Sequence, residues 1–302
     1  MALSENSDGC RAIDWGFHLR VRYLIPITAL LLSAPLLRAE KWDHLLDKDL
    51  SRFEVWMGIP HSTVKGLPEG TYQSDKVQTN RGKPLGLDAD VKKVFSVIEE
   101  EGQPVLKITG EIYGGLTTHD EFSNYHLSTM MRWGDKKWEP RIDQKRDSGI
   151  LYHCFGKHGA FWATWKASLE FQVQESDLGD FIPLAGPKVE IRGRAISKRG
   201  FRFDPEGDEV RIDGYIQAGS EPQRPHGEWN HLEIYVLEDR AVHVVNGVVV
   251  LVLDKATKPD GTPLTKGQLQ IQSEAAEVYY KELKLRPITE FPEAIRTHFA
   301  AE

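Results

Sequence analysis

Alternating apolar and polar positions run through the chain from residue 41 onward, whereas helical repeats of apolar residues are scarce. The clearest example is residues 241–253 (AVHVVNGVVVLVL), where β-branched runs flank the pair Asn246-Gly247. Asparagine and glycine both tolerate the positive φ angles of a two-residue turn. This segment therefore predicts a β-hairpin.

The same signals predict many further short strands, separated by clusters of glycine, proline and aspartate such as Gly114-Gly115. These strands are expected at residues 93–99, 104–112, 122–133, 148–154, 168–175, 188–196, 209–216, 229–237, 268–273 and 277–286. Many short strands at such spacing indicate an all-β sandwich or jelly roll rather than a parallel sheet with crossover helices. A short helix is expected only near 291–300, and the polar segments 134–147 and 176–187 are expected to be rim loops.

The N-terminal segment has the parts of an export signal. Residues 24–37 (LIPITALLLSAPLL) form a mainly apolar run, preceded by Arg20 and Arg22 and followed by the small residue Ala39. This order predicts a signal peptide over residues 1–39 and a periplasmic or secreted protein. The run is shorter than the roughly 20 residues of a membrane span. A buried N-terminal helix and an uncleaved anchor are the alternatives for this segment.

Composition and charge narrow the class of protein. The 302 residues are 40% hydrophobic and 27% charged, which is typical of a globular protein. With 38 basic and 45 acidic residues the formal charge is −7, so a nucleic-acid partner is not expected. Cys10 and Cys154 cannot form a disulfide framework or a cysteine zinc site. No phosphate loop, dinucleotide-binding turn or nucleophile elbow is present, so no cofactor is indicated. The sequence leaves a divalent metal and the oligomeric state open.

Several predicted strands carry polar side chains in line on one face. In strand 168–175, alternation places Glu170, Gln172 and Gln174 together. The other aligned sets are Gly149, Leu151 and His153; His126, Ser128, Met130 and Arg132; and Gln270, Gln272 and Glu274. Because an acid and several amides are costly to bury, these strands predict a solvated polar groove. An exposed polar sheet face, with histidines in ordinary structural roles, is the alternative interpretation.

Several blocks of the sequence resemble, in order, the 3-keto-disaccharide hydrolase family. The blocks are Leu45-Leu46-Asp47-Lys48-Asp49-Leu50, residues 136–141 (KKWEPR), 145–154 (KRDSGILYHC), 169–175 (LEFQVQE) with 179–181 (GDF), 227–231 (GEWNH), and 267–274 leading to Arg286-Pro287. Together they span roughly residues 42–288. The resemblance therefore implies one domain over residues 40–288, after the signal peptide and before a C-terminal tail at 289–302.

The resemblance implies a concanavalin-like jelly roll of two curved antiparallel sheets with a concave sugar-binding face, like lectins and laminarinase-type glucanases. It also implies a 3-keto sugar as the partner. Oxidation at C3 acidifies the C2 hydrogen, so a base can remove it, after which the glycosidic oxygen leaves and water adds. Many family members have aspartate where this chain has Glu175 and histidine where it has Glu274. Ala275 also replaces a glycine of the family pattern.

This reaction needs a base near C2, a cation or donor for the enolate oxygen, and groups that hold the sugar. The base is expected to be Glu170, with His153 as second choice, and the cation Arg132 or Arg146. Glu175 is a further candidate acid, reachable only through a bulge. The candidate sugar-binding residues are Gln172, Gln174, Gln272 and Glu274, which could hydrogen-bond hydroxyls, and Trp133, Trp138 and Tyr152, which could stack on a ring.

Two other classes of function remain open at this point. A non-catalytic sugar-binding module would use the same groove without a base in reach. A conventional glycoside hydrolase needs two carboxyl groups across the scissile bond. On the face of Glu170 its neighbours along the strand are amides, Gln172 and Gln174, which disfavours that mechanism. A structural protein of the cell envelope is the least specific alternative.

Overall fold

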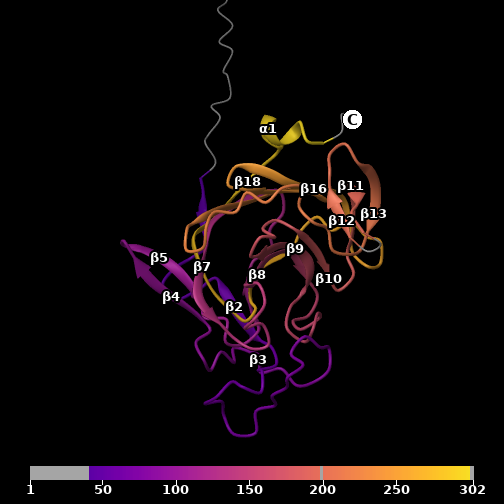
Figure 1. Ribbon diagram of the computed structural model, residues 1–302. Helices are drawn as coiled ribbons and strands as arrows, with labels where there is room; N and C mark the ends of the chain where they lie inside the picture. Colours follow the sequence, from indigo (N-terminus) through magenta and orange to yellow (C-terminus); the bar gives the residue numbers. More distant parts are fainter. Residues whose placement is uncertain (1–40, 198–199, 300–302) are drawn as a thin grey trace, which may run out of the picture. The chain divides into compact units, whose positions relative to one another are not determined.

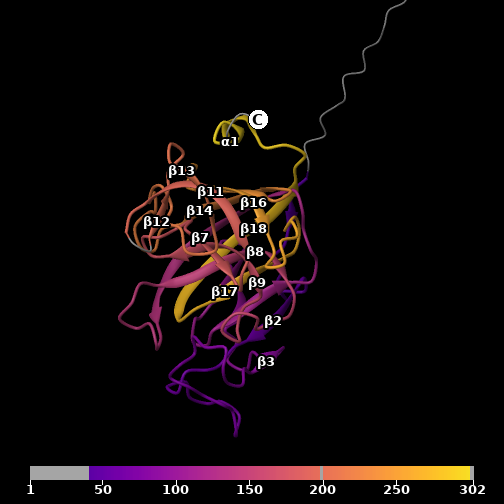
Figure 2. The same cartoon turned by 90° about the vertical axis from the view of Figure 1, so that its right-hand side faces the viewer.

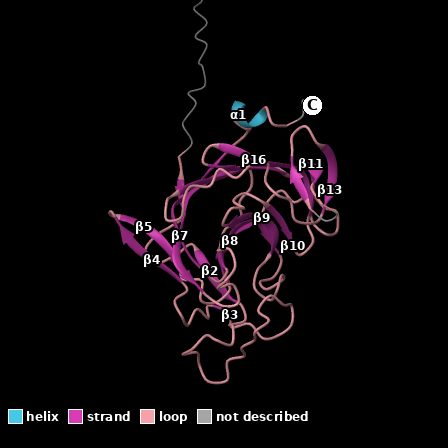
Figure 3. Ribbon diagram, viewed as in Figure 1, coloured by secondary structure: helices cyan, strands magenta, loops and turns pink. Residues whose placement is uncertain are grey.

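Two antiparallel β-sheets, packed face to face, form the body of the protein in a computed structural model that describes residues 41–197 and 200–299 (Figures 1 and 3). This confirms the predicted all-β fold, a jelly-roll sandwich of two curved antiparallel sheets. The predicted signal peptide at residues 1–39 lies outside the described residues. Among the described residues, no helix is long and apolar enough to cross a membrane.

The larger sheet has eleven strands. Its central path, from one edge to the other, is β12 (Phe201–Phe203), β11 (Lys188–Ala195), β16 (Val248–Thr257), β15 (Arg240–Val245), β14 (Asn230–Leu237), β7 (Tyr125–Lys137), β18 (Ala276–Pro287), β5 (Gln103–Ile108) and β4 (Phe95–Glu100). Two short strands pair beside this path: β1 (Asp43–His44) with β18, and β13 (Asp208–Ile212) with β11.

The smaller sheet has seven strands and carries the candidate site. Their order is β10 (Phe181–Leu184), β9 (Ala167–Gln174), β8 (Asp147–Phe155), β17 (Gln268–Ser273), β6 (Gly114–Thr118), β2 (Phe53–Met57) and β3 (Gly86–Leu87). Its apolar face packs on the larger sheet, and the main hydrophobic core fills the space between them with residues such as Phe171, Ile150 and Leu116. The opposite face holds the aligned polar residues.

The hairpin predicted at residues 241–253 is confirmed as β15 and β16, joined by Asn246-Gly247 with φ angles of 50° and 80°. Every other predicted strand is also present, with ends shifted by a few residues. The single α-helix of the described residues, α1 (Glu293–Arg296), falls inside the predicted segment 291–300. Figure 2 shows α1 at the end of the sandwich, beyond β16 and β18.

Parts of three segments predicted as turns or loops are instead strands, and one of them is 134–137, which continues β7. Gly114-Gly115 opens β6, in the interior of the smaller sheet, and 181–184 forms the edge strand β10. Glycine is ordinarily a turn signal, but here a Cβ on Gly115 would lie 2.5 Å from the side-chain amide of Gln270. The close approach of a neighbouring side chain explains a glycine inside a strand.

Candidate functional site

The register of the smaller sheet brings polar side chains from three strands onto one face. In the pairing of β8 with β9, Asp147 lies opposite Gln174, Gly149 opposite Gln172, and Leu151 opposite Glu170. On the other side of β8, Glu274 forms a bridge with Asp147 just beyond the end of β17. Directly opposite residues point to the same face of a sheet, so these side chains meet.

Three carboxyl groups and one guanidinium form the centre of this face. Arg141, from the loop between β7 and β8, lies 2.6 Å from Oδ2 of Asp147 and 3.4 Å from Oε1 of Glu274. The amides of Gln172 and Gln174 donate to the two carboxylate oxygens of Asp147. Glu170 is the third carboxyl group and has no cation within 4 Å among the described residues.

The site is buried rather than a solvated groove, which corrects the sequence-based expectation. Asp147 is 3% exposed, Glu170 2% and Glu274 6%. Arg141 covers the carboxylates of Asp147 and Glu274, and the Gln78 amide, from a distant loop, also donates to Glu274. Loops therefore cover the carboxyl groups, and the alternation of residues within a single strand does not predict such a cover.

Burial and mutual repulsion change the acidity of these groups. Burial, followed by the charges of Glu274 and Asp147, raises the pKa of Glu170 well above its ordinary value of 4.5. Burial also raises the pKa of Glu274 to about 7, although Arg141 acts in the opposite direction. The pKa of Asp147 is raised by burial and by the charge of Glu274. One guanidinium cannot neutralise three buried carboxylates, so burial and mutual repulsion favour the protonated forms of these carboxyl groups.

Four buried polar atoms at this site have no hydrogen-bond partner among the described residues. They are Oε1 of Gln172, Oε1 of Gln272, Nε of Arg141 and the hydroxyl of Tyr113. An unpaired buried donor or acceptor costs about 1–3 kcal/mol, so a cluster of them requires an explanation. Both acceptors and donors are present, which is the set that sugar hydroxyl and carbonyl groups can satisfy.

Gly149 makes room for the meeting of Glu170 and Gln272. A Cβ at this position would lie 2.2 Å from Oε1 of Glu170 and 2.6 Å from Oε1 of Gln272. Both side chains are buried, so a methyl group at this position would have to displace their ends. The glycine therefore sets the position of the candidate base.

Substitution Gly149→Ala is expected to displace Glu170 and lower activity by at least tenfold, with a loss of stability of about 1–3 kcal/mol. Thermal unfolding and steady-state kinetics measure the two effects. Gly115→Ala is the matched control, because its Cβ would crowd Gln270 on the same sheet. A similar loss of stability without the loss of activity is expected there. Equal activities in the two variants would show that Gly149 does not position the base.

His153 does not share the face of Glu170, which corrects the prediction from alternation. A bulge interrupts β8 between Tyr152 and Phe155, and His153 has a φ of 52° within it. Its ring therefore turns into the sandwich, 6.2 Å from that of Tyr125 and 5.8 Å from that of Tyr152. Burial lowers the pKa of His153 to about 4. A base on the opposite side of the sheet cannot act with Glu170.

Arg132 also lies away from the carboxyl cluster. It belongs to β7 of the larger sheet, pairs with Glu100 at 2.6 Å and stacks over the rings of Trp229 and Tyr279. His126 and Ser128 accompany it on that sheet, so the predicted groove shared by β7 and β9 is wrong.

Arg146 and Glu175 form a pair of their own at the end of β8 and β9. Arg146 lies 2.7 Å from Oε1 of Glu175, and its other guanidinium nitrogens donate to the backbone oxygens of Gly134 and Asp135 on β7. These contacts point toward the larger sheet and away from the face of Glu170. The arginine that the structure brings to the carboxyl groups is Arg141.

The predicted aromatic residues have different locations. Trp133 and Tyr152 are buried in the core between the sheets, where the Tyr152 hydroxyl contacts His243 at 2.9 Å. Trp138 is half-buried on the loop that carries Arg141, and its indole donates to the backbone oxygen of Thr109. Trp138 is therefore the one of the three that lies on the site's side of the smaller sheet.

The described residues hold no group of three or more histidine, cysteine or acidic side chains arranged to bind a metal ion.

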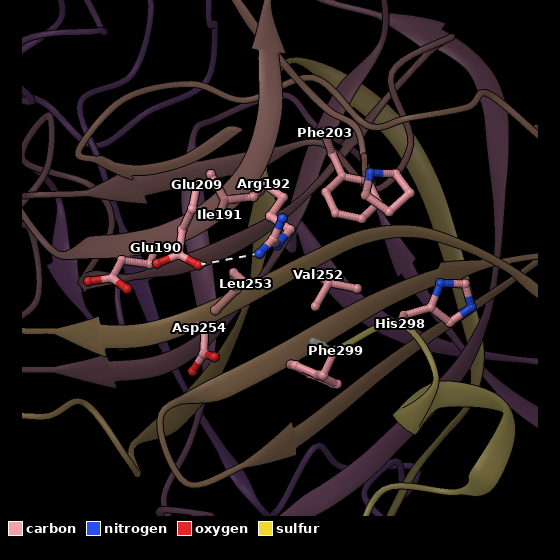
Figure 4. A pocket seen from close by; sticks show the side chains of 11 residues that line it. Glu190, Ile191, Arg192, Phe203, Glu209, Val252, Leu253, Asp254, His298 and Phe299 are labelled. Atoms are coloured by element: carbon pink, nitrogen blue, oxygen red, sulfur yellow. Dashed lines mark ion pairs between the residues drawn. The ribbon is translucent and has the colours of Figure 1, made fainter. Parts of the chain in front are cut away.

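A separate hollow, shown in Figure 4, lies between β11, β16 and the C-terminal residues His298 and Phe299. None of the predicted site residues lines it. Its carboxylates Glu190 and Glu209 already face Lys255 and Arg192.

The family model for the 3-keto-alpha-glucoside-1,2-lyase-like domain matches residues 44–286. The chain belongs to this family. The match includes every carboxyl group of the site and Arg141. It confirms the resemblance inferred from the sequence blocks. Among curated proteins, none matches the chain.

Solved structures that match this member of the 3-keto-alpha-glucoside-1,2-lyase-like family are distant. A provisionally assigned glycosyl hydrolase from Parabacteroides distasonis ATCC 8503 is 16% identical, with a TM-score of 0.44, over 82% of this chain and 100% of that chain. The carbohydrate-binding module CBM66 from Bacillus subtilis is 10% identical, with a TM-score of 0.39, over 64% and 91%. LamAcat from Zobellia galactanivorans is 9% identical, with a TM-score of 0.39, over 80% and 93%.

Three residues of this lyase-like domain were missed as site residues in the sequence. Asp147 shares its face with Gly149, but the strand was predicted to begin at 148. Arg141 stands within the block KKWEPR that supported the family resemblance, so that block was the available signal. Tyr113 precedes Gly114-Gly115, where a turn was expected. Burial, then the charge of Glu274, raises its pKa above the ordinary value of 10.0.

Proposed function

We propose that the protein cleaves 3-keto-glycosides, including 3-keto-disaccharides, by proton abstraction at C2, β-elimination and hydration. The observation that carries this proposal is the cluster of three buried carboxyl groups, two of them paired with Arg141, together with four unpartnered polar atoms at the same site. Membership of the lyase-like family supports the same substrate class. The proposal builds on the carbohydrate-related, hydrolase-like character of the domain.

Glu170 is proposed as the base that removes the C2 proton. It lacks a cationic partner among the described residues, and its raised pKa makes its carboxylate a stronger base than an ordinary glutamate. The electron pair of the C–H bond forms the enolate and then expels the glycosidic oxygen from C1. Elimination leaves a C1=C2 double bond conjugated with the C3 carbonyl; water then adds its OH at C1, a proton returns to C2, and the free 3-keto sugar results.

Arg141 is proposed as the cation that stabilises the enolate oxygen. Its Nε is buried without a partner among the described residues, and a guanidinium stays charged at every working pH. The Tyr113 hydroxyl, also unpartnered there, is a donor for the departing glycosidic oxygen. The amide oxygens of Gln172 and Gln272 would accept hydrogen bonds from sugar hydroxyls.

Conventional glycoside hydrolysis is the second candidate. Along its own strand Glu170 has only amide neighbours, but neighbouring strands bring further carboxyl groups to the same face. Asp147 and Glu274 lie on the face of Glu170, and a pair of carboxyl groups is what that mechanism requires. A non-catalytic sugar-binding module would use the same unpartnered atoms without turnover.

A panel of 3-keto-disaccharides and their unoxidised parents separates these functions when the released monosaccharide is measured. Release from the keto sugars alone is expected. Equal release from the parent sugars would instead indicate a conventional glycosidase. Binding of both series without release would indicate a binding module.

We also propose that the protein acts in the periplasm or outside the cell, on the basis of the apolar run at residues 24–37. The mature N-terminus is then expected near Glu40. N-terminal sequencing of the protein from its native host tests this, and recovery of residues 1–20 would contradict cleavage. Recovery of that N-terminus in the membrane fraction would support an uncleaved anchor.

A further inference from the structure

A second apolar cluster covers the same sheet face as the carboxyl groups. It is separate from the core between the sheets and consists of Val77, Tyr113, Leu151, Cys154, Trp165, Leu184 and Ala275, with Trp138, Phe161 and Trp162 packed against it. Leu151 ties this cluster to the site, because it pairs directly with Glu170 in the sheet register. Directly opposite residues have Cβ atoms about 4.5–5.5 Å apart.

The aromatic rings of this cluster form a continuous series that leads away from the carboxyl groups. Tyr113, whose ionisation responds to Glu274 and Arg141, stacks on Trp165 with a centroid distance of 5.7 Å. Trp165 is 5.7 Å from Trp162. Tyr113 and Trp165 are 2% and 1% exposed, whereas Trp162 is only partly buried. Trp162 also stacks on Phe161, with a centroid distance of 4.6 Å, and the part of its ring that stays exposed is the part of this series that a ligand can reach from solvent.

The backbone that presents Trp162 is in an unfavourable conformation. Trp162 and Ala163 have φ angles of 49° and 55°, although neither is glycine. Such a backbone conformation is strained in residues other than glycine and persists only where the surroundings impose it. Here the Trp56 indole donates to the backbone oxygen of Ala163, and the Thr164 hydroxyl donates to that of Trp162.

The contact between Thr164 and Gly58 shows how firmly this turn is held. A Cβ on Gly58 would lie 2.4 Å from the Thr164 hydroxyl oxygen, so a glycine is needed for the turn to sit where it does. The Trp165 indole adds a further hydrogen bond to the backbone oxygen of Gly114. The fold thus holds a partly exposed tryptophan in a strained turn beside the site.

We infer that Trp162 forms the subsite for the leaving sugar, by stacking on its apolar face. This inference rests on the proposed function, which places the 3-keto ring at Glu170. The ring joined through the glycosidic oxygen must then lie one ring farther out, and Trp162 lies outside Trp165 and Tyr113 in the aromatic series. A flat, apolar indole suits the C–H face of a pyranose and makes Trp162 a specificity-determining residue.

The test compares ligands with and without a second ring. In a Glu170→Gln background, in which turnover is expected to be slow, calorimetry measures the affinity for a 3-keto-disaccharide and for the corresponding 3-keto methyl glycoside. Trp162→Ala is expected to weaken disaccharide binding about tenfold, as the loss of roughly 50–60 Å² of buried apolar area implies. The affinity for the methyl glycoside is expected to stay unchanged. Trp162→Phe should restore part of the disaccharide affinity.

Trp229→Ala is the matched control, since Trp229 is a partly buried tryptophan that directly precedes β14 of the larger sheet and contacts the cations of Arg132 and Lys281. It should change neither affinity. Equal weakening of both ligands by Trp162→Ala would overturn the inference and give Trp162 a structural role only. Unchanged affinity for the disaccharide would overturn it as well.

The same measurements with the unoxidised disaccharide and methyl glycoside keep the two proposals distinguishable. If Trp162→Ala weakens binding of the unoxidised disaccharide but not of the unoxidised methyl glycoside, the result supports the subsite at Trp162. This holds even if the keto group is not needed for binding. A keto sugar that binds no better than its parent contradicts the proposed function alone. If Trp162→Ala weakens the binding of disaccharide and methyl glycoside equally in both series, the result contradicts the subsite but not the proposed function.

Discussion

Substitution Glu170→Gln is expected to reduce kcat on a 3-keto-disaccharide by about 10²–10⁴, the usual contribution of a positioned base. Glutamine keeps the shape of the side chain above Gly149 but cannot accept the C2 proton. Because the wild-type carboxyl group carries a raised pKa within a crowded acidic cluster, its neutral replacement should leave the fold intact. Steady-state kinetics and thermal unfolding of the purified variant measure both effects.

The pH dependence of the wild-type enzyme gives an independent measure of this role. A base must be ionised to act, so kcat/KM should fall as the pH decreases through the pKa of Glu170. Burial and the neighbouring acids raise that pKa well above 4.5, so the acidic limb should lie above the ordinary carboxyl range. Glu274, with a pKa of about 7, contributes to the same limb through its charge.

Glu277→Gln is the control for a buried glutamate outside the site, since Glu277 lies on β18 and pairs with Lys107. Its kinetics should match those of the wild type. Activity of Glu170→Gln within a factor of about three of wild type would remove Glu170 from the role of base. A large fall in the melting temperature would instead identify Glu170 as a structural acid.

The parts of the fold that sequence could predict are those with local signals. The turn at Asn246-Gly247 and the aligned face of Glu170, Gln172 and Gln174 each depend on residues close together in the chain. Local alternation fails where the backbone departs from regularity. The bulge at His153 reverses the direction of its side chain, and no nearby residue type in the sequence predicts this bulge.

The centre of the site depends on contacts between distant segments. Arg141 meets Glu274 across 133 residues, and Gln78 reaches the same carboxylate across 196. The pattern of a single strand does not show which sheet the strand joins. The sequence therefore allowed Arg132 on β7 and Glu170 on β9 to line one groove, although the two strands belong to different sheets. Arg141 itself stands in a polar segment that predicts only a loop.

Substitution Arg141→Gln is expected to lower kcat and kcat/KM together by about 10²–10³, while KM changes little. A guanidinium that stabilises the enolate contributes mainly in the transition state, and removal of one such donor has an effect of this size. The same change also leaves Asp147 and Glu274 without their cation, which favours their protonated forms. Steady-state kinetics on a 3-keto-disaccharide measures the split between kcat and KM.

Breaking a buried ion pair can cost about 3–5 kcal/mol, so Arg141→Gln could lose activity because it unfolds. Arg141→Lys is the second variant that separates this effect from a loss of catalysis. Lysine keeps the charge between Asp147 and Glu274 but loses the planar fork that spans both, so partial rescue of kcat is expected. Arg132→Gln is the control on the larger sheet and should leave the kinetics unchanged, since Arg132 pairs with Glu100 there. An increase in KM alone in Arg141→Gln would show that Arg141 holds the substrate and that another group stabilises the enolate. Loss of activity in Arg132→Gln with none in Arg141→Gln would place the reaction on the opposite sheet.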